Sequence, residues 1–227
     1  MNPMLKPHYN TYLNLVNDNF PKSVIQDNSE LKSFFQSIHN SFIMSDILTE
    51  FGFVSSNSNV YNLIIEYKFF YSRLLTTLPL NDLFLIQNLL RLIVEKQYRI
   101  IYGFNFYNCG EKRIRKETRI KMDNRLINVI DTNLHMILNK LYVELSEDIH
   151  HTNSSISDFY DIQKRLLTEN NIAISIQQTL DDLEKIFSEL IFINAINNDS
   201  DKLTTGAKTR IENHLNSQLS THILQST

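Results

Sequence analysis

Apolar residues recur along most of this chain at intervals of three and four, the spacing that places them on one face of an α-helix. Leu31, Phe34, Ile38 and Phe42, for example, share such a face. The same periodicity predicts helices over residues 9–17, 32–50, 60–77, 83–102, 123–150, 158–167, 172–196 and 208–224.

Polar and small residues between these segments predict where the helices begin and end. Ser29 and Asn81 are residue types that cap helix N-termini, and Gly103 stands where a C-terminal cap glycine is expected. Residues 55–59 are rich in serine and asparagine and predict a loop. Residues 104–110 predict an irregular or strand-like aromatic segment, and residues 197–206 a polar linker.

The composition favours a helical fold as well. The 227 residues include only 4 glycines and 4 prolines, whereas sheet proteins use glycine freely in their turns. We therefore predict an all-α protein, an up-and-down helical bundle with additional N- and C-terminal helices. The expected organisation is a bundle domain over residues 1–200, followed by a linker and an amphipathic helix over residues 201–227.

Cysteine use and the N-terminal sequence indicate a compartment. Cys109 is the only cysteine, so neither an internal disulfide nor a cysteine-based zinc site is expected. The N-terminus lacks the apolar core of a signal peptide, and no apolar run is long enough to span a membrane. A cytoplasmic protein without a membrane partner is the expectation. No phosphate-binding glycine loop or His-Glu-x-x-His motif is present, so neither a metal nor another cofactor is expected.

One border of the predicted helix over residues 123–150 carries a stripe of polar side chains. His135, Asn139, Tyr142, Ser146 and His150 follow one another at intervals of three and four, so they are neighbours on the helix surface. At such a border a histidine pKa can be tuned, and His150 could act as a general acid or base. The alternative is that amphipathic side chains simply occupy the boundary between core and water.

A second stripe lies on the predicted helix over residues 83–102. Arg91, Glu95 and Arg99 are spaced four residues apart, and Glu95 could bridge the two arginines. If this stripe faced His150, the two guanidinium groups could hold a phosphate. A solvated face with ordinary ion pairs is the alternative. Burial of the stripe against the neighbouring helix would favour the phosphate site, and an open stripe would favour the solvated face.

Two segments together resemble a known family. Residues 141–150 match the pattern Tyr-x-x-Leu-Ser-x-x-Val/Ile-His through Tyr142, Ser146 and His150, and residues 90–103 are similar to the Arg-x-x-x-Glu helix that accompanies it. Both patterns resemble HEPN-like bacterial proteins (higher eukaryotes and prokaryotes nucleotide-binding domains). The similarity covers roughly residues 81–196.

The resemblance implies a helical bundle from an antiviral defence, toxin or abortive-infection system. Because family members are often dimeric, a homodimer is expected. Many members are metal-independent ribonucleases. In their chemistry a histidine activates the 2′-hydroxyl or protonates the leaving oxygen, while an arginine stabilises phosphate charge. The usual signature places the arginine about four to six residues before the histidine. Here residues 143–146 hold no basic side chain, so Arg91 or Arg99 would have to supply it, with Glu95, Tyr142 and Ser146 orienting the groups.

Charge is unevenly distributed, and one segment suits a nucleic acid. The net charge is −3, yet residues 112–125 form a basic run that could neutralise several phosphates of an RNA or nucleotide. Its cations include Lys112, Arg113, Arg115, Lys116, Arg119 and Lys121. A solvated connection before a helix explains the same run equally well.

The C-terminal segment offers a different function. Ile211, Leu215, Leu219 and Ile223 recur every four residues and form a narrow apolar stripe. The stripe could fold back on its own domain, or it could dock on a second subunit or another protein. A non-catalytic helical module that regulates or scaffolds a partner protein is therefore the second hypothesis.

Overall fold

The chain is described by a computed structural model. It describes residues 2–21, 23, 25–106, 130–151, 172–197 and 203–225, without the side chains of 105–106, 147–151 and 196–197. Throughout these ranges the regular elements are helices and no strand occurs. The predicted all-α class is therefore confirmed. None of the described helices combines the length and the apolarity that crossing a membrane requires.

The described ranges contain the following elements, in chain order. They are η1 (Pro3–Leu5), α1 (Lys6–Asn19), α2 (Ser29–Thr49), α3 (Gly52–Ser56), α4 (Ser58–Thr77), η2 (Leu78–Leu80), α5 (Leu83–Phe106), α7 (Thr132–His151), α9 (Ile172–Asn197), α10 (Thr205–His214) and α11 (Ser217–Leu224).

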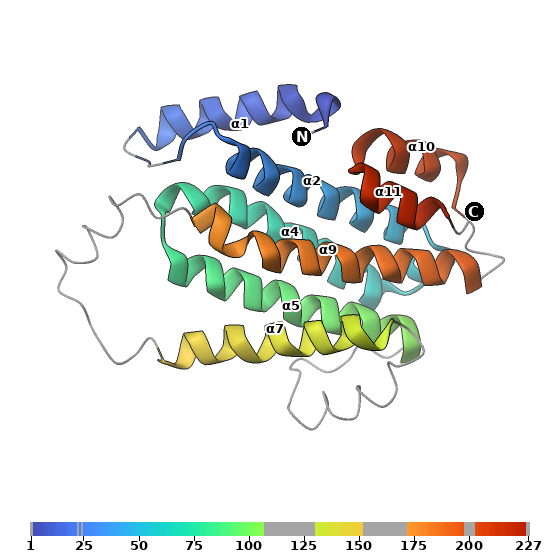
Figure 1. The fold of residues 1–227 in the computed structure, drawn as a ribbon. Helices are drawn as coiled ribbons and strands as arrows, with labels where there is room; N and C mark the ends of the chain where they lie inside the picture. The colour runs from blue at the N-terminus through green and yellow to red at the C-terminus, as the bar shows by residue number, and fades with distance from the viewer. Residues whose placement is uncertain are drawn as a thin grey trace.

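The long helices form a closed ring. In order around it, α2 packs on α4, α4 on α5, α5 on α7, α7 on α9, and α9 on α2. Successive helices run in opposite directions, except that α2 and α9 run the same way (Figure 1). An odd number of alternating helices must close its ring with one parallel pair. The predicted up-and-down bundle is thus confirmed, with α2 and α9 as its closing contact.

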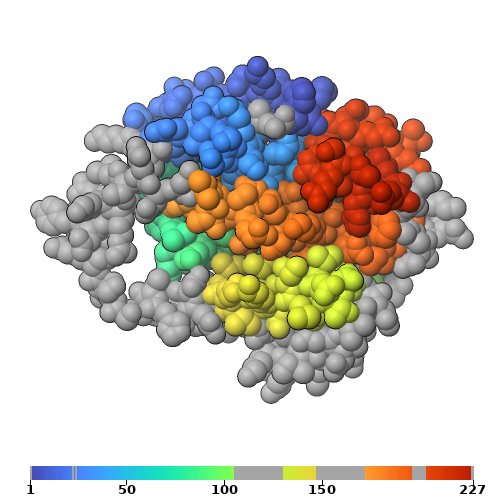
Figure 2. Space-filling model, in the orientation of Figure 1, coloured from blue at the N-terminus to red at the C-terminus, as the bar shows by residue number. Residues whose placement is uncertain are grey.

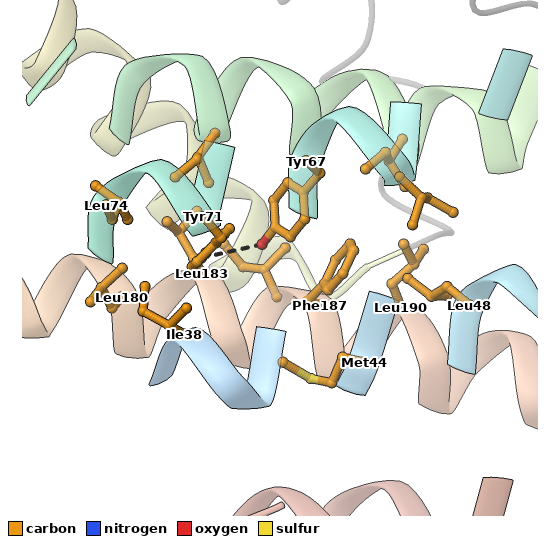
Figure 3. Close-up of a cluster of buried hydrophobic side chains, with 14 of the residues drawn as sticks. Ile38, Met44, Leu48, Tyr67, Tyr71, Leu74, Leu180, Leu183, Phe187 and Leu190 are labelled. Atoms are coloured by element: carbon orange, nitrogen blue, oxygen red, sulfur yellow. Dashed lines mark hydrogen bonds between the residues drawn. The ribbon is translucent and has the colours of Figure 1, made fainter. Parts of the chain in front are cut away.

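Large apolar side chains from α2, α4 and α9 fill the space between these helices (Figure 3). Tyr67 and Phe187 are fully buried, and their ring centroids lie 4.6 Å apart. The Tyr67 hydroxyl donates to that of Tyr71 at 3.3 Å. Each buried ring removes a large apolar area from water, so this cluster contributes strongly to stability.

The terminal helices cover the ring from outside. The rings of Tyr9 and Tyr12 on α1 each lie 5.4 Å from Phe35 of α2. At the other end of the chain, α10 packs on α2 and α11 packs on α9 (Figure 1).

The C-terminal segment forms two helices rather than the predicted continuous one. Leu215 is extended, and the Asn216 side chain accepts a hydrogen bond from the Leu219 amide at 2.9 Å, which starts α11. The apolar stripe of this segment is buried within the chain, as Ile211 and Ile223 are 0 % exposed. Of the two orientations left open by the sequence, the segment folds back on its own bundle.

Several predicted boundaries are wrong because neighbouring polar residues compete to cap a helix. Asn81 adopts a left-handed conformation with φ of 52°, and it is Asp82 whose carboxylate accepts from the Leu85 amide at 3.1 Å. Likewise Asn28 rather than Ser29 caps α2, accepting from the Leu31 amide at 2.8 Å. Either neighbour has the chemistry of a cap, so composition alone does not choose between them.

Other boundaries differ because packing extends or interrupts a helix. The predicted loop over 55–59 is largely helical, since α3 is anchored by the fully buried Val54. Helix α5 continues past Gly103 to Phe106, and Phe104 packs edge-on against Phe53 at 5.4 Å. The predicted helix over 123–150 is not helical at 130–131 and begins at Thr132. The predicted helix over 158–167 lies outside the described residues.

Candidate functional site

The two predicted polar stripes meet where α5 and α7 lie side by side and antiparallel (Figure 1). Arg91 of α5 donates from Nε to the Ser146 hydroxyl of α7 at 3.4 Å. Its guanidinium carbon lies 5.9 Å from the centre of the Tyr142 ring. The Ser146 hydroxyl in turn donates to the Tyr142 carbonyl at 2.6 Å. The structure therefore brings together Arg91, Tyr142 and Ser146, and we call these three residues the α5–α7 border.

The guanidinium group of Arg91 is half-buried, and no ion pair joins it to a carboxylate among the described residues. Among the described residues, neither Arg91 nor Arg99 forms an ion pair with Glu95, so the expected bridge between the arginines is absent there. In contrast, Lys96 on the same helix pairs with Glu66 of α4. The α5–α7 border thus carries a cation that has no carboxylate partner within the described part of the chain, and its guanidinium can bond an anionic ligand.

The helix register separates Arg99 from this site. Tyr98 contacts the rings of Tyr142 and His135 at centroid distances of 6.0 and 6.2 Å, so this part of α5 faces α7 between His135 and Tyr142. Eight residues of helix separate Arg91 and Arg99, about 12 Å along the axis. Arg99 Nε is buried and has no hydrogen-bond partner within the described part of the chain. Arg99 therefore lies about two helical turns from Arg91 along α5.

Two groups of predicted site residues are not placed. His150 belongs to the last turn of α7, one turn beyond Ser146, and its side chain lies outside the described residues. Also outside them are all the predicted nucleic-acid-binding cations, namely Lys112, Arg113, Arg115, Lys116, Arg119 and Lys121.

A second polar cluster, missed from the sequence, lies between α2 and α9. Glu184 is only 4 % exposed, and its Oε2 accepts a hydrogen bond from the side-chain Nδ2 of Asn40 at 3.1 Å. Gln36 donates to the Asn40 carbonyl oxygen at 2.8 Å. About two turns earlier on α9, Gln177 donates to the Ser37 hydroxyl at 3.0 Å. Buried polar groups such as these are stable only when partnered.

Burial raises the pKa of the Glu184 carboxyl to about 7, because removal from water disfavours its charged form. Ser37 and Asn40 favour the ionised form and oppose the rise, while the charge of Asp181 adds to it. A carboxyl that titrates near neutral pH can hold or release a proton under ordinary conditions.

The sequence does contain a signal for this cluster. Glu184 lies four residues after Leu180 and three before Phe187, both fully buried, so it occupies a core position in the apolar stripe of α9. A charged residue at such a position predicts either a buried polar network or a site. The periodicity could have flagged Glu184, but not its partner on α2.

Comparison with protein-family models, with curated proteins and with solved structures finds no match to this chain.

Proposed function

We propose that this chain binds RNA at the α5–α7 border, with Arg91 holding a backbone phosphate. The observation that carries the proposal is the half-buried Arg91 guanidinium, which lies between Ser146 and the Tyr142 ring without a carboxylate partner among the described residues. A guanidinium fork matches the geometry of phosphate oxygens and can bond two of them at once.

The surrounding groups fit the same ligand. The Tyr142 ring is buried, at 7 % exposed, and packs against the Arg91 guanidinium, which helps to hold this cation at the border. The basic run over residues 112–125 would add further phosphate contacts.

Cleavage is the second part of the proposal and depends on His150, four residues beyond Ser146 on α7. The resemblance to HEPN-like proteins suggests that the histidine removes a proton from the 2′-hydroxyl or donates one to the leaving 5′-oxygen. The 2′-oxygen would form a bond to phosphorus as the bond to the 5′-oxygen breaks. The products would be a cyclic phosphate and a free 5′-hydroxyl. Arg91 would stabilise the charge that develops on the phosphate oxygens.

Fluorescence anisotropy with a labelled single-stranded RNA, in the presence of EDTA, tests binding. Arg91→Ala is expected to weaken binding by about tenfold and to lower the slope of log K against log salt by about 0.7. Arg73→Ala is the matched control, since Arg73 is an exposed arginine of α4 outside the border. Equal affinities for the two variants would refute the site.

His150→Ala separates cleavage from binding. This variant is expected to bind RNA as the native chain does while producing no cyclic-phosphate fragments on a denaturing gel. If both proteins form fragments equally, or if neither does, the catalytic part of the proposal is refuted. The anisotropy measurement then decides the binding part independently.

A further inference from the structure

A cavity of about 680 Å³ opens between α7, α9 and α11. We call it the α9–α11 pocket. On the face shown in Figure 2, α9 is flanked by α7 on one side and by α11 on the other. Its lining includes Leu134 from α7, Asp181, Glu184 and Glu189 from α9, and Asn216 and His222 from the cap and body of α11. Its size is in the range of sites that take a small organic ligand.

Negative charge predominates in this pocket. Three carboxyl groups line it, together with Lys185 and His222. The Nε2 atom of His222 lies 2.9 Å from the Glu189 carboxylate, which ties α11 to α9. Lys185 is 3.5 Å from Asp182, a carboxylate outside the lining. The pocket therefore attracts cations rather than anions.

Glu184 is the feature that indicates a ligand. Its side chain lines the pocket but is 4 % exposed, and Oε1 accepts no hydrogen bond of normal geometry within the described part of the chain, although the nearby Ser37 hydroxyl favours the ionised carboxylate. Its other oxygen is satisfied by Asn40. A buried carboxylate oxygen without a donor is costly. A cationic N–H donor in the pocket would remove that cost.

The donor groups favour an organic cation over a metal ion. No cluster of three or more His, Cys, Asp or Glu side chains suited to a metal ion occurs among the described residues. The carboxyl groups are instead spread along α9 at intervals of three and five residues, with the neutral polar groups of Ser188, Asn216 and Thr221 between and opposite them. Separate acceptors spaced in this way suit separate N–H groups of an extended ligand.

We infer that the α9–α11 pocket binds an organic cation that carries two or more ammonium groups. One ammonium group is held by Glu184 at the buried end, and another by Glu189 beside His222. Because Glu189 and His222 belong to different helices, the bound cation also strengthens the attachment of α11 to the bundle.

Isothermal titration calorimetry of the full chain with spermidine tests this inference. At pH 8, where Glu184 is ionised, saturable binding at one site is expected, and an uncharged diol of similar length should give no heat of binding. Glu184→Gln and Glu189→Gln should each weaken spermidine binding at least about tenfold. Glu212→Gln is the matched control, because this substitution removes the same charge at an exposed position of α10.

Other outcomes would contradict the inference, and amide exchange provides a second test of it. Absence of saturable binding, or equal weakening in all three variants, would mean that spermidine associates only with general surface charge. Tighter binding of Mg²⁺ alone, lost in Glu184→Gln, would make the pocket a metal site instead. If Glu184→Gln fails to fold by circular dichroism, Glu189→Gln decides the matter. Slower amide exchange in α11 on adding spermidine is expected, and unchanged exchange would contradict the proposed contact with Glu189.

Discussion

Replacing Glu184 with glutamine is expected to change how the stability of the protein depends on pH. The pKa of this carboxyl is raised by burial from 4.5 to about 7. Glutamine keeps the shape and an oxygen that can accept from Asn40, but it cannot ionise. The substitution therefore removes the titration while retaining most of the packing.

The two pKa values determine whether stability rises or falls with pH. Below about pH 4.5 the carboxyl is protonated in both the folded and the unfolded chain, and its contribution to stability is fully present. As the pH rises towards 7 the unfolded chain loses the proton first, so the free energy of unfolding falls. At about 1.4 kcal/mol per pKa unit, the loss is about 3 kcal/mol between these limits.

Urea unfolding followed by circular dichroism, at several pH values from about 4.5 to 8, measures this difference. The stability of Glu184→Gln relative to the native chain should rise by about 3 kcal/mol across that range. Comparing the two proteins at each pH cancels the titration of all other groups, and Glu212→Gln should track the native chain. A difference that stays constant with pH would show that Glu184 is not the buried titrating group described above.

Three further substitutions test other parts of the structure. Burial, with smaller effects of His214 and His8, lowers the pKa of His39 to about 4, so the free energy of unfolding should fall as the pH drops from 6.5 towards 4. In His39→Gln this fall should be smaller by about 2 kcal/mol, a figure reduced because the ring is partly exposed. An equal fall for both proteins in urea unfolding at acid pH would contradict this. Phe187→Ala should cost about 3–5 kcal/mol in urea unfolding because Phe187 is 0 % exposed, whereas Phe192→Ala, at a half-buried position, should cost clearly less; equal losses would argue against the central cluster. Asn28→Ala should destabilise α2 by about 1 kcal/mol through loss of its cap, and a larger effect of Ser29→Ala would mean that the cap is misassigned.

Apolar periodicity alone was enough to locate the long helices. The predicted helix over 172–196 is observed as α9 (Ile172–Asn197), and the one over 60–77 as α4 (Ser58–Thr77). These segments repeat every three to four residues over several turns, and a helix imposes that repeat locally, without reference to the rest of the chain. The same local rule identified Arg91, Tyr142 and Ser146 as members of two border stripes.

Only the tertiary structure decided which stripes meet. Arg91 and Ser146 are separated by 55 residues, and their contact follows from the antiparallel register of α5 and α7. That register also places Tyr98, next to Arg99 in the sequence, against His135 and Tyr142 of α7. Glu184 likewise acquires its raised pKa from burial between α9 and α2, while the hydrogen bond from Asn40, 144 residues away in the chain, opposes the rise. Helix periodicity is a property of neighbours in sequence, whereas burial, charge pairing and pKa depend on neighbours in space, and those are fixed only when the ring of helices closes.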